Sequence, residues 1–148
     1  MELSSAISVL NDVLQTVRDS EQGFTTAAGA LKDPQTKGLF ERYARQRGEM
    51  ARELEQEIGK LGGTAGTGGS VSGSLHRGWM NLKGAISALD DKAIISEAER
   101  GEDVAKGAYA TALNESLPAG VRRLIEDQAA IVRLAHDEVR ALEKAHAR

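Results

Sequence analysis

The regular spacing of apolar residues in the first 31 positions constrains the fold of this chain more than any other feature. Steps of three and four residues separate these side chains, which places them on one face of an α-helix. They are Leu3, Ile7, Leu10, Leu14, Val17, Phe24, Ala28 and Leu31. Between Val17 and Phe24 the same face holds Glu21. A carboxylate on an inward face is costly unless it is paired or bound to a metal ion, so Glu21 is a candidate functional residue.

Breaks in this pattern divide the chain into five predicted helices. Asp33-Pro34 separates the first two helices, Gly62-Gly63 ends the second, and Pro118 precedes the last. The predicted helices span about residues 4–32, 34–61, 73–89, 91–114 and 119–146, and residues 62–72 form a flexible loop. A chain of 148 residues has the size of one domain with its own core. We therefore expect residues 1–148 to form a single helical-bundle domain.

The lengths of the connections predict how the helices are arranged. Tight turns join the first two long helices and the last two, so each pair is expected to form an antiparallel hairpin. The connection between the pairs runs from Gly62 to Asp90 and contains the short helix 73–89, in which Trp79 is expected to anchor the segment against the bundle. A connection this long can cross the length of a bundle. The sequence predicts an all-α, ferritin-like four-helix bundle made of two hairpins and a long crossover.

Composition excludes several classes of function. The net charge is −3 with both signs interspersed, whereas nucleic-acid binding needs a basic stripe. There is no cysteine, which excludes disulfides and thiolate metal sites. No apolar run approaches the ~20 residues of a membrane span, and no signal-peptide pattern is present. We expect a cytoplasmic protein that contacts neither nucleic acid nor membrane.

Four polar residues fall on the inward faces of the predicted helices. These are Glu21, Arg47, Glu102 and Gln128. Counted from the turns, Glu21 and Arg47 lie at similar depths in one hairpin, and Glu102 and Gln128 do so in the other. We predict a buried polar layer near mid-bundle, in which Glu21 pairs with Arg47 and Glu102 bonds to Gln128. A different register of the second helix would instead turn Gln46 and Glu49 inward.

A dimetal site is the functional alternative for these groups. Dimetal carboxylate bundles take a Glu from each of two helices and a Glu-x-x-His from each of the other two. Glu21 and Glu102 can fill the first role, but residues 47–50 and 128–131 include no histidine. The candidate metal ligands are Glu21, Glu102, Gln128, Glu49 and His136. His136 stands ~12 Å of helix rise beyond Gln128, so we interpret it as a boundary histidine. A structural layer without a cofactor is favoured over an iron site.

Four strings in the chain are distinctive. They are Glu21-Gln22-Gly23-Phe24, Gln46-Arg47, Leu75-His76-Arg77-Gly78-Trp79-Met80 and Glu99-Arg100-Gly101-Glu102-Asp103. With these strings the chain resembles, over nearly its whole length, an uncharacterised bacterial family of four-helix-bundle proteins of unknown function with a ferritin-like fold. The resemblance implies a ferritin-like fold and a bacterial source, and it assigns no catalytic residue.

Two functional hypotheses follow. The first is a non-enzymatic helical bundle that forms a homo-oligomer or binds a protein partner, with a role in stress response. The second is a cryptic dimetal carboxylate protein that binds iron through Glu21 and Glu102. The first is favoured because the bundle pattern is intact while the histidine ligands are missing, so we expect the protein not to be an enzyme.

Overall fold

The computed structural model describes residues 2–66 and 78–146, and this part of the chain contains helices and no strand. It consists of four long helices and one short helix. These are α1 (Leu3–Ala30), α2 (Pro34–Lys60), α3 (Leu82–Ser87), α4 (Asp91–Leu113) and α5 (Ala119–His146). The prediction of an all-α chain is confirmed.

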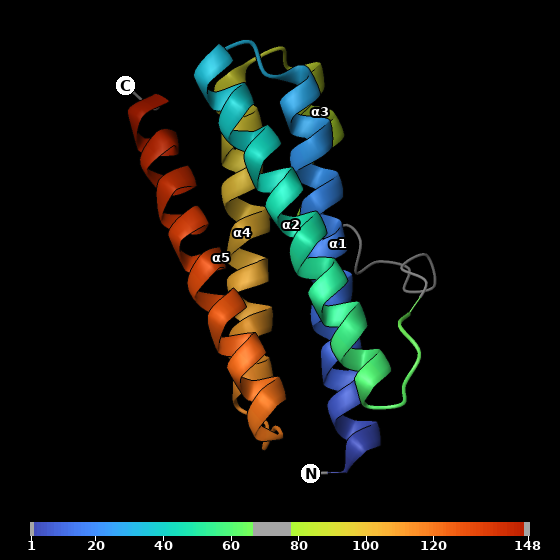
Figure 1. Ribbon diagram of the computed structural model, residues 1–148. Helices are drawn as coiled ribbons and strands as arrows, with labels where there is room; N and C mark the ends of the chain where they lie inside the picture. Colours follow the sequence, from blue (N-terminus) through green and yellow to red (C-terminus); the bar gives the residue numbers. More distant parts are fainter. Residues whose placement is uncertain (1, 67–77, 147–148) are drawn as a thin grey trace.

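The long helices are arranged as two antiparallel hairpins that lie against each other (Figure 1). Helices α1 and α2 form one hairpin, and α4 and α5 form the other. Helices α2 and α4 run in the same direction, because α2 ends at the end of the bundle opposite to that where α4 begins (Figure 1). The segment between them therefore crosses the length of the bundle.

The short helix of the crossover is the part of the chain that differs most from its prediction. Residues 67–77 lie outside the described residues, and they include the start of the predicted helix 73–89 and part of the predicted loop 62–72. Gly78 to Asn81 form a turn, so α3 begins only at Leu82. The reason is tertiary: a Cβ atom on Gly78 would lie 2.7 Å from the Cα atom of Gly101, so the crossover backbone lies directly on α4. Close packing thus overrides the helical pattern at this point.

Hydrogen bonds at one end of the bundle join the two hairpins. Asp33 caps α2, because its carboxylate accepts hydrogen bonds from the backbone nitrogen and the hydroxyl of Thr36. These bonds also lower the pKa of Asp33. The Asp91 carboxylate, in the first turn of α4, accepts hydrogen bonds from the backbone nitrogens of Lys32 and Asp33, at 2.9 and 2.8 Å. The α1–α2 turn is therefore fixed to the start of α4.

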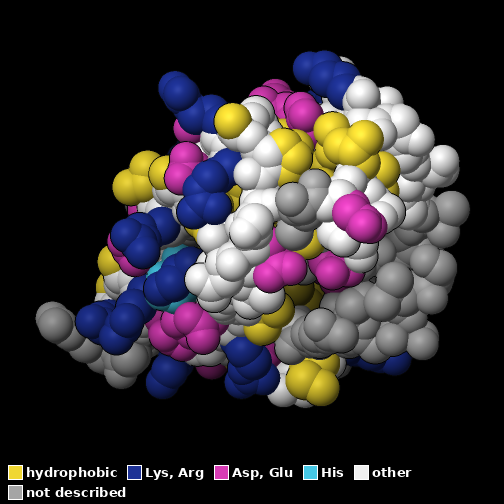
Figure 2. Space-filling model, turned by 90° about the horizontal axis from the view of Figure 1, so that it is seen from below, with side chains coloured by type: hydrophobic (Ala, Val, Ile, Leu, Met, Phe, Trp, Pro, Cys, Tyr) yellow, Lys and Arg dark blue, Asp and Glu magenta, His cyan; other side chains and the backbone are white. Residues whose placement is uncertain are grey.

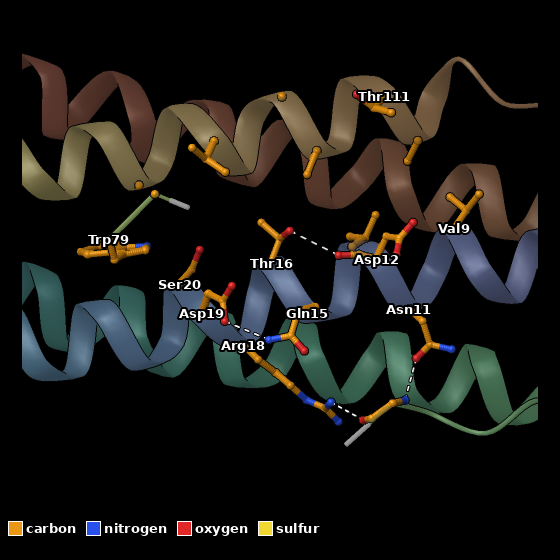
Figure 3. A pocket seen from close by; sticks show the side chains of 18 of the residues that line it. Val9, Asn11, Asp12, Gln15, Thr16, Arg18, Asp19, Ser20, Trp79 and Thr111 are labelled. Carbon is orange, nitrogen blue, oxygen red and sulfur yellow. Dashed lines mark hydrogen bonds between the residues drawn. The ribbon is translucent and has the colours of Figure 1, made fainter. Parts of the chain in front are cut away.

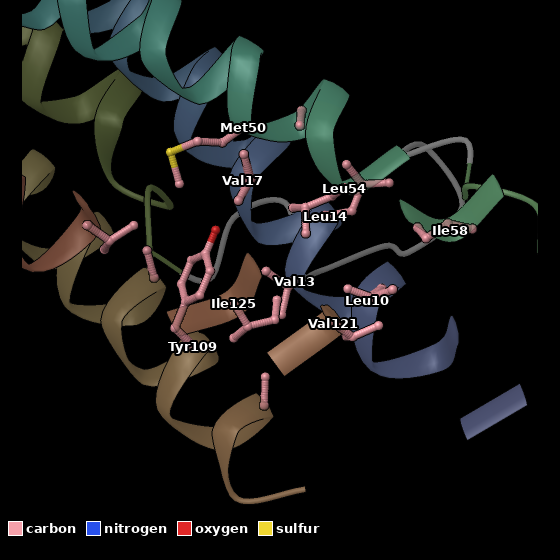
Figure 4. Packing of buried hydrophobic residues seen from close by; sticks show 14 residues of the cluster. Leu10, Val13, Leu14, Val17, Met50, Leu54, Ile58, Tyr109, Val121 and Ile125 are labelled. Carbon is pink, nitrogen blue, oxygen red and sulfur yellow. The ribbon is translucent and has the colours of Figure 1, made fainter. Parts of the chain in front are cut away.

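The hydrophobic core consists of two clusters stacked along the bundle axis. One cluster lies toward the N-terminus of α1 and is drawn in Figure 4, and Leu10, Leu14, Leu54, Ile125 and Tyr109 are among its members. The other contains the aromatic residues Phe24, Phe40, Tyr43 and Trp79 with Ile94, Ile95, Ala98 and Val139. Along α2 and α4, the boundary between the clusters falls at Arg47 and Glu102. The candidate polar residues therefore lie where the apolar core is interrupted.

Candidate functional site

A completely buried ion pair lies at the centre of the bundle. The guanidinium of Arg47 on α2 donates two hydrogen bonds to the carboxylate of Glu102 on α4, at 2.6 and 2.7 Å, and neither side chain is exposed to solvent. Two parallel N–H···O bonds are the strongest geometry for such a pair. Burial by itself lowers the pKa of Arg47, but the charge and hydrogen bonds of Glu102 outweigh it, so that the pKa is raised. Arg47 therefore keeps its positive charge at any ordinary pH.

An aromatic face completes the surroundings of the Arg47 guanidinium. Its central carbon lies 5.4 Å from the centroid of the Phe24 ring, which is within the range of a cation–π contact. Phe24 in turn contacts Phe40, Tyr43 and Trp79 through ring centroids 5.0 to 5.2 Å apart. Arg47 Nε is buried without a hydrogen-bond partner among the described residues. The cation is thus held by one carboxylate and an aromatic wall.

The predicted pairing of Glu21 with Arg47 is wrong. Glu21 is half-buried, and its carboxylate lies over α2, where a Cβ atom on Gly48 would be 2.7 Å from Glu21 Oε2. The long Arg47 side chain instead reaches across the bundle to α4, and Phe24 rather than Glu21 supplies the α1 contact. Helix register predicts which residues face inward, but the direction of a flexible side chain depends on the neighbouring helices.

The predicted bond between Glu102 and Gln128 is also wrong, although Gln128 is buried as an inward residue should be. The Gln128 amide oxygen accepts a hydrogen bond of 2.7 Å from the Tyr109 hydroxyl. Its amide nitrogen donates to the Met50 carbonyl at 3.2 Å and to Glu53 at 2.9 Å. Gln128 on α5 therefore links α4 to α2 beside the ion pair. Burial raises the pKa of Tyr109 and keeps the hydroxyl protonated.

The alternative register of α2 does not occur. Arg47 is buried, Glu49 is exposed, and Gln46 is half-buried with a buried amide oxygen that has no hydrogen-bond partner in the described part of the chain. Glu49 therefore lies away from the centre.

Trp79 is held by glycines from two helices. Cβ atoms on Gly23 of α1 and Gly101 of α4 would each lie 2.4 Å from the nearest indole carbon. Only glycine at both positions lets the ring lie flat between the helices, and Trp79 is 6% exposed as a result. The Gly23, Gly78, Trp79 and Gly101 of the strings quoted above thus belong to one contact, which fixes the crossover to the bundle.

His136 lies in a cluster that helix-by-helix reasoning did not bring together. Its Nε2 is 3.3 Å from Glu99 Oε1 and 3.5 Å from Asp103 Oδ1, both on α4. The imidazole is 2% exposed, whereas Asp103 is largely exposed. A signal was present in the sequence, because residues four apart on a helix share a face. Of the other two histidines, His146 lies in the last turn of α5 and His76 is outside the described residues.

A groove of about 680 Å³ separates α1 from α4 on one side of the bundle (Figure 3). Asn11, Asp12, Gln15 and Thr16 line it along α1, and Trp79 forms one end. Asn11 also binds the crossover, because it donates a hydrogen bond to the Thr64 carbonyl and accepts one from the backbone nitrogen of Gly66. Both polar and apolar side chains therefore line the groove.

Comparison with known proteins gives a family but no function. No helix in the described ranges combines the length and the apolar character that crossing a membrane requires. No curated protein sequence matches the chain. A family model described as "Domain of unknown function (DUF2383)" matches residues 5–115, which is more than half of the chain and includes the ion pair and the tryptophan contact. The resemblance to an uncharacterised family is confirmed, and the chain belongs to this family of unknown function.

Proposed function

We propose that this protein is a non-enzymatic, ferritin-like helical bundle whose surface binds a second copy of the same chain. The order of the helices supports the ferritin-like assignment, because two hairpins joined by one long crossover are the topology of that class. The observation that carries the proposal is the Arg47–Glu102 pair, which occupies the bundle centre with a guanidinium and a carboxylate.

The same pair argues against the alternative in which Glu21 and Glu102 ligate iron. Both Glu102 oxygens accept hydrogen bonds from Arg47, and a metal ion would have to displace that cation. A guanidinium left buried without its carboxylate costs several kcal/mol, on the order of 3–5. The Glu21 carboxylate lies over Gly48 of α2. The residues at the centre therefore do not fit a dimetal cofactor.

The surface best suited to self-association surrounds α3. A second groove, of about 530 Å³, lies between α1 and α3, with Trp79, Met80, Leu82 and Ile86 among its lining residues. Met80 is 62% exposed, and flexible methionines are common in adaptable protein-binding surfaces. An apolar centre with polar neighbours is the usual anatomy of an interface.

A two-fold dimer would bring this groove of both copies together, because such an interface uses the same patch on each subunit. Lys83 of α3 is the exposed charged residue of its lining, whereas Asp19 of α1 is 7% exposed and accepts a hydrogen bond from Gln15. Acidic and basic side chains also intermingle over the end of the bundle shown in Figure 2, which is unlike the single-sign surface that nucleic acid requires.

Light scattering coupled to size-exclusion chromatography tests this proposal. We expect a mass above the 15.8 kDa of one chain, and we expect Met80→Lys to shift it toward the monomer. Leu134→Lys is the matched control, since Leu134 is 67% exposed on α5, away from the α3 groove. A monomeric wild type at high concentration, or equal effects of both variants, would contradict self-association through this groove.

Metal analysis decides between the proposal and the iron alternative. Protein purified from iron-supplemented cells is compared with Glu21→Gln and Glu102→Gln variants by elemental analysis. Two iron ions per chain that are lost in both variants would overturn the non-enzymatic assignment.

A further inference from the structure

The cluster of Glu99, Asp103 and His136 lies at the interface of α4 and α5 and takes no part in the central ion pair. Glu99 and Asp103 are one turn apart on α4 and project from the same face. His136 of α5 points its Nε2 between them, and one ligand atom from each residue lies within 4.8 Å of the other two. Two helices thus bring three potential metal ligands to one point.

We propose that these three residues bind a single divalent first-row transition metal ion, with zinc as the representative case. A tetrahedral site with ligand distances of about 2.1 Å has edges of about 3.4 Å between ligand atoms. The two measured distances from His136 Nε2 to the carboxylate oxygens are 3.3 and 3.5 Å. An ion fits between these atoms with small side-chain movements, and a fourth position remains for water.

The buried imidazole nitrogen is an independent indication of a ligand. His136 Nε2 is inaccessible to solvent and has no hydrogen-bond partner among the described residues, although two carboxylates lie beside it. An unsatisfied buried nitrogen is costly. A metal ion bound to its lone pair satisfies this nitrogen and neutralises the two carboxylates together.

The opposite ring nitrogen has the partner that a metal-bound histidine requires. His136 Nδ1 lies 3.4 Å from Asp137 Oδ1, so that a proton on Nδ1 faces a carboxylate. Histidine ligands usually donate their second N–H to such an acceptor, which fixes the tautomer and leaves the other nitrogen free to bind metal. Asp137 is a positioning residue here.

Charge and access favour a cation at this point. The two carboxylates supply negative charge, and no Lys or Arg pairs with either of them in the part of the chain that the structure describes. The Glu99 and Asp103 side chains are 24% and 67% exposed, so an ion can enter from solvent. One nitrogen and two oxygens suit zinc, manganese or iron better than a soft metal. Bound there, the ion cross-links α4 to α5.

Titration of the chelator-treated full chain tests the site. We expect isothermal calorimetry to give one Zn²⁺ per chain, and Co²⁺ to produce visible absorption bands of a site with fewer than six ligands. The double variant Glu99→Gln/Asp103→Asn should bind at least about 100-fold more weakly and still fold, because these side chains are not in the core. Asp137→Asn should weaken binding about tenfold, as expected for a group that acts through the histidine.

Matched controls separate this site from other acidic groups and histidines. Glu126→Gln/Asp127→Asn removes the same charge from exposed positions of α5 and should leave Zn²⁺ binding unchanged. His76→Ala and His146→Ala should also leave it unchanged. In imidazole ¹⁵N spectra, Zn²⁺ should shift the His136 Nε2 signal while Nδ1 stays protonated. The proposal is overturned if Zn²⁺ leaves this signal unchanged, because the cluster would then be an ion pair with a protonated imidazole. It is also overturned if the double variant binds Zn²⁺ as tightly as the wild type.

Discussion

The two polar clusters on α4 differ in exposure although their carboxylates lie within five residues of one another. Glu102 is fully buried and bound by Arg47, whereas Glu99 and Asp103 lie beside His136 and reach solvent. On a helix, Glu99 and Asp103 point ~40° apart, and Glu102 points ~60–100° away from them. Carboxylates on faces of α4 less than a third of a turn apart therefore differ in role. The buried one stabilises the core, and the two that reach solvent can bind a ligand.

The largest change in stability is expected when the buried cation, Arg47, is removed. Arg47→Ala leaves Glu102 charged and unpaired in the core, so we expect the free energy of unfolding to fall by about 3–5 kcal/mol. Urea denaturation followed by circular dichroism measures it. Glu99→Gln, at the open cluster, should change stability by less than about 0.5 kcal/mol.

A double variant then separates the burial of charge from the loss of packing. Arg47→Met/Glu102→Leu replaces the pair with apolar groups, and we expect it to be more stable than Arg47→Ala. If Arg47→Ala unfolds at the same urea concentration as the wild type, Arg47 and Glu102 do not form a buried ion pair. The contrast with the solvent-accessible carboxylates Glu99 and Asp103 would then disappear.

High pH should lower the stability of the buried core through its two tyrosines, Tyr43 and Tyr109. Burial and a hydrogen bond to Glu138 raise the pKa of Tyr43, and burial raises that of Tyr109. A raised pKa adds stability that is complete below the unfolded value of 10.0 and is lost as the pH rises above it. The free energy of unfolding should therefore fall by up to about 1.4 kcal/mol per pH unit for each tyrosine. Tyrosinate absorbance and helical circular dichroism should change together, and phenol ionisation in a folded protein would contradict this.

The packing of Trp79 on Gly101 provides a third comparison within the same turns of α4. Gly101→Ala places a methyl group against the indole, which we expect to cost about 1–3 kcal/mol. Gly107→Ala on the same helix has open space around the added Cβ atom and should stabilise by about 0.5–1 kcal/mol. Thermal denaturation of both variants provides the measurement, and equal shifts in Tm would show that Trp79 moves freely.

The smallest effect is expected at Glu21. Because Glu21 is half-buried over Gly48 and does not bind Arg47, Glu21→Gln should lower stability by no more than about 0.5 kcal/mol. A loss near that of Arg47→Ala, measured in the same urea series, would show that Glu21 belongs to the buried network after all.

The residues that form the long helices could be predicted from the sequence because their signals are local. Apolar residues three and four apart define the buried face of α1, and Asp33-Pro34 ends one helix and starts the next. The inward orientation of Arg47, Glu102 and Gln128 follows from the same periodicity. The crossover was predicted less well, because the packing of Gly78 against Gly101 depends on residues distant in the chain.

The sequence by itself determined the long helices, their turns and the inward position of Arg47, Glu102 and Gln128, since each depends on neighbours within about one helical turn. Only the tertiary structure decided the partners. The Arg47 side chain binds Glu102 of α4, and this partner is set by how α2 and α4 pack across the bundle. The cluster of His136 with Glu99 and Asp103 likewise exists only where α4 and α5 pack together, because no pattern within one helix records which residues of another helix lie opposite.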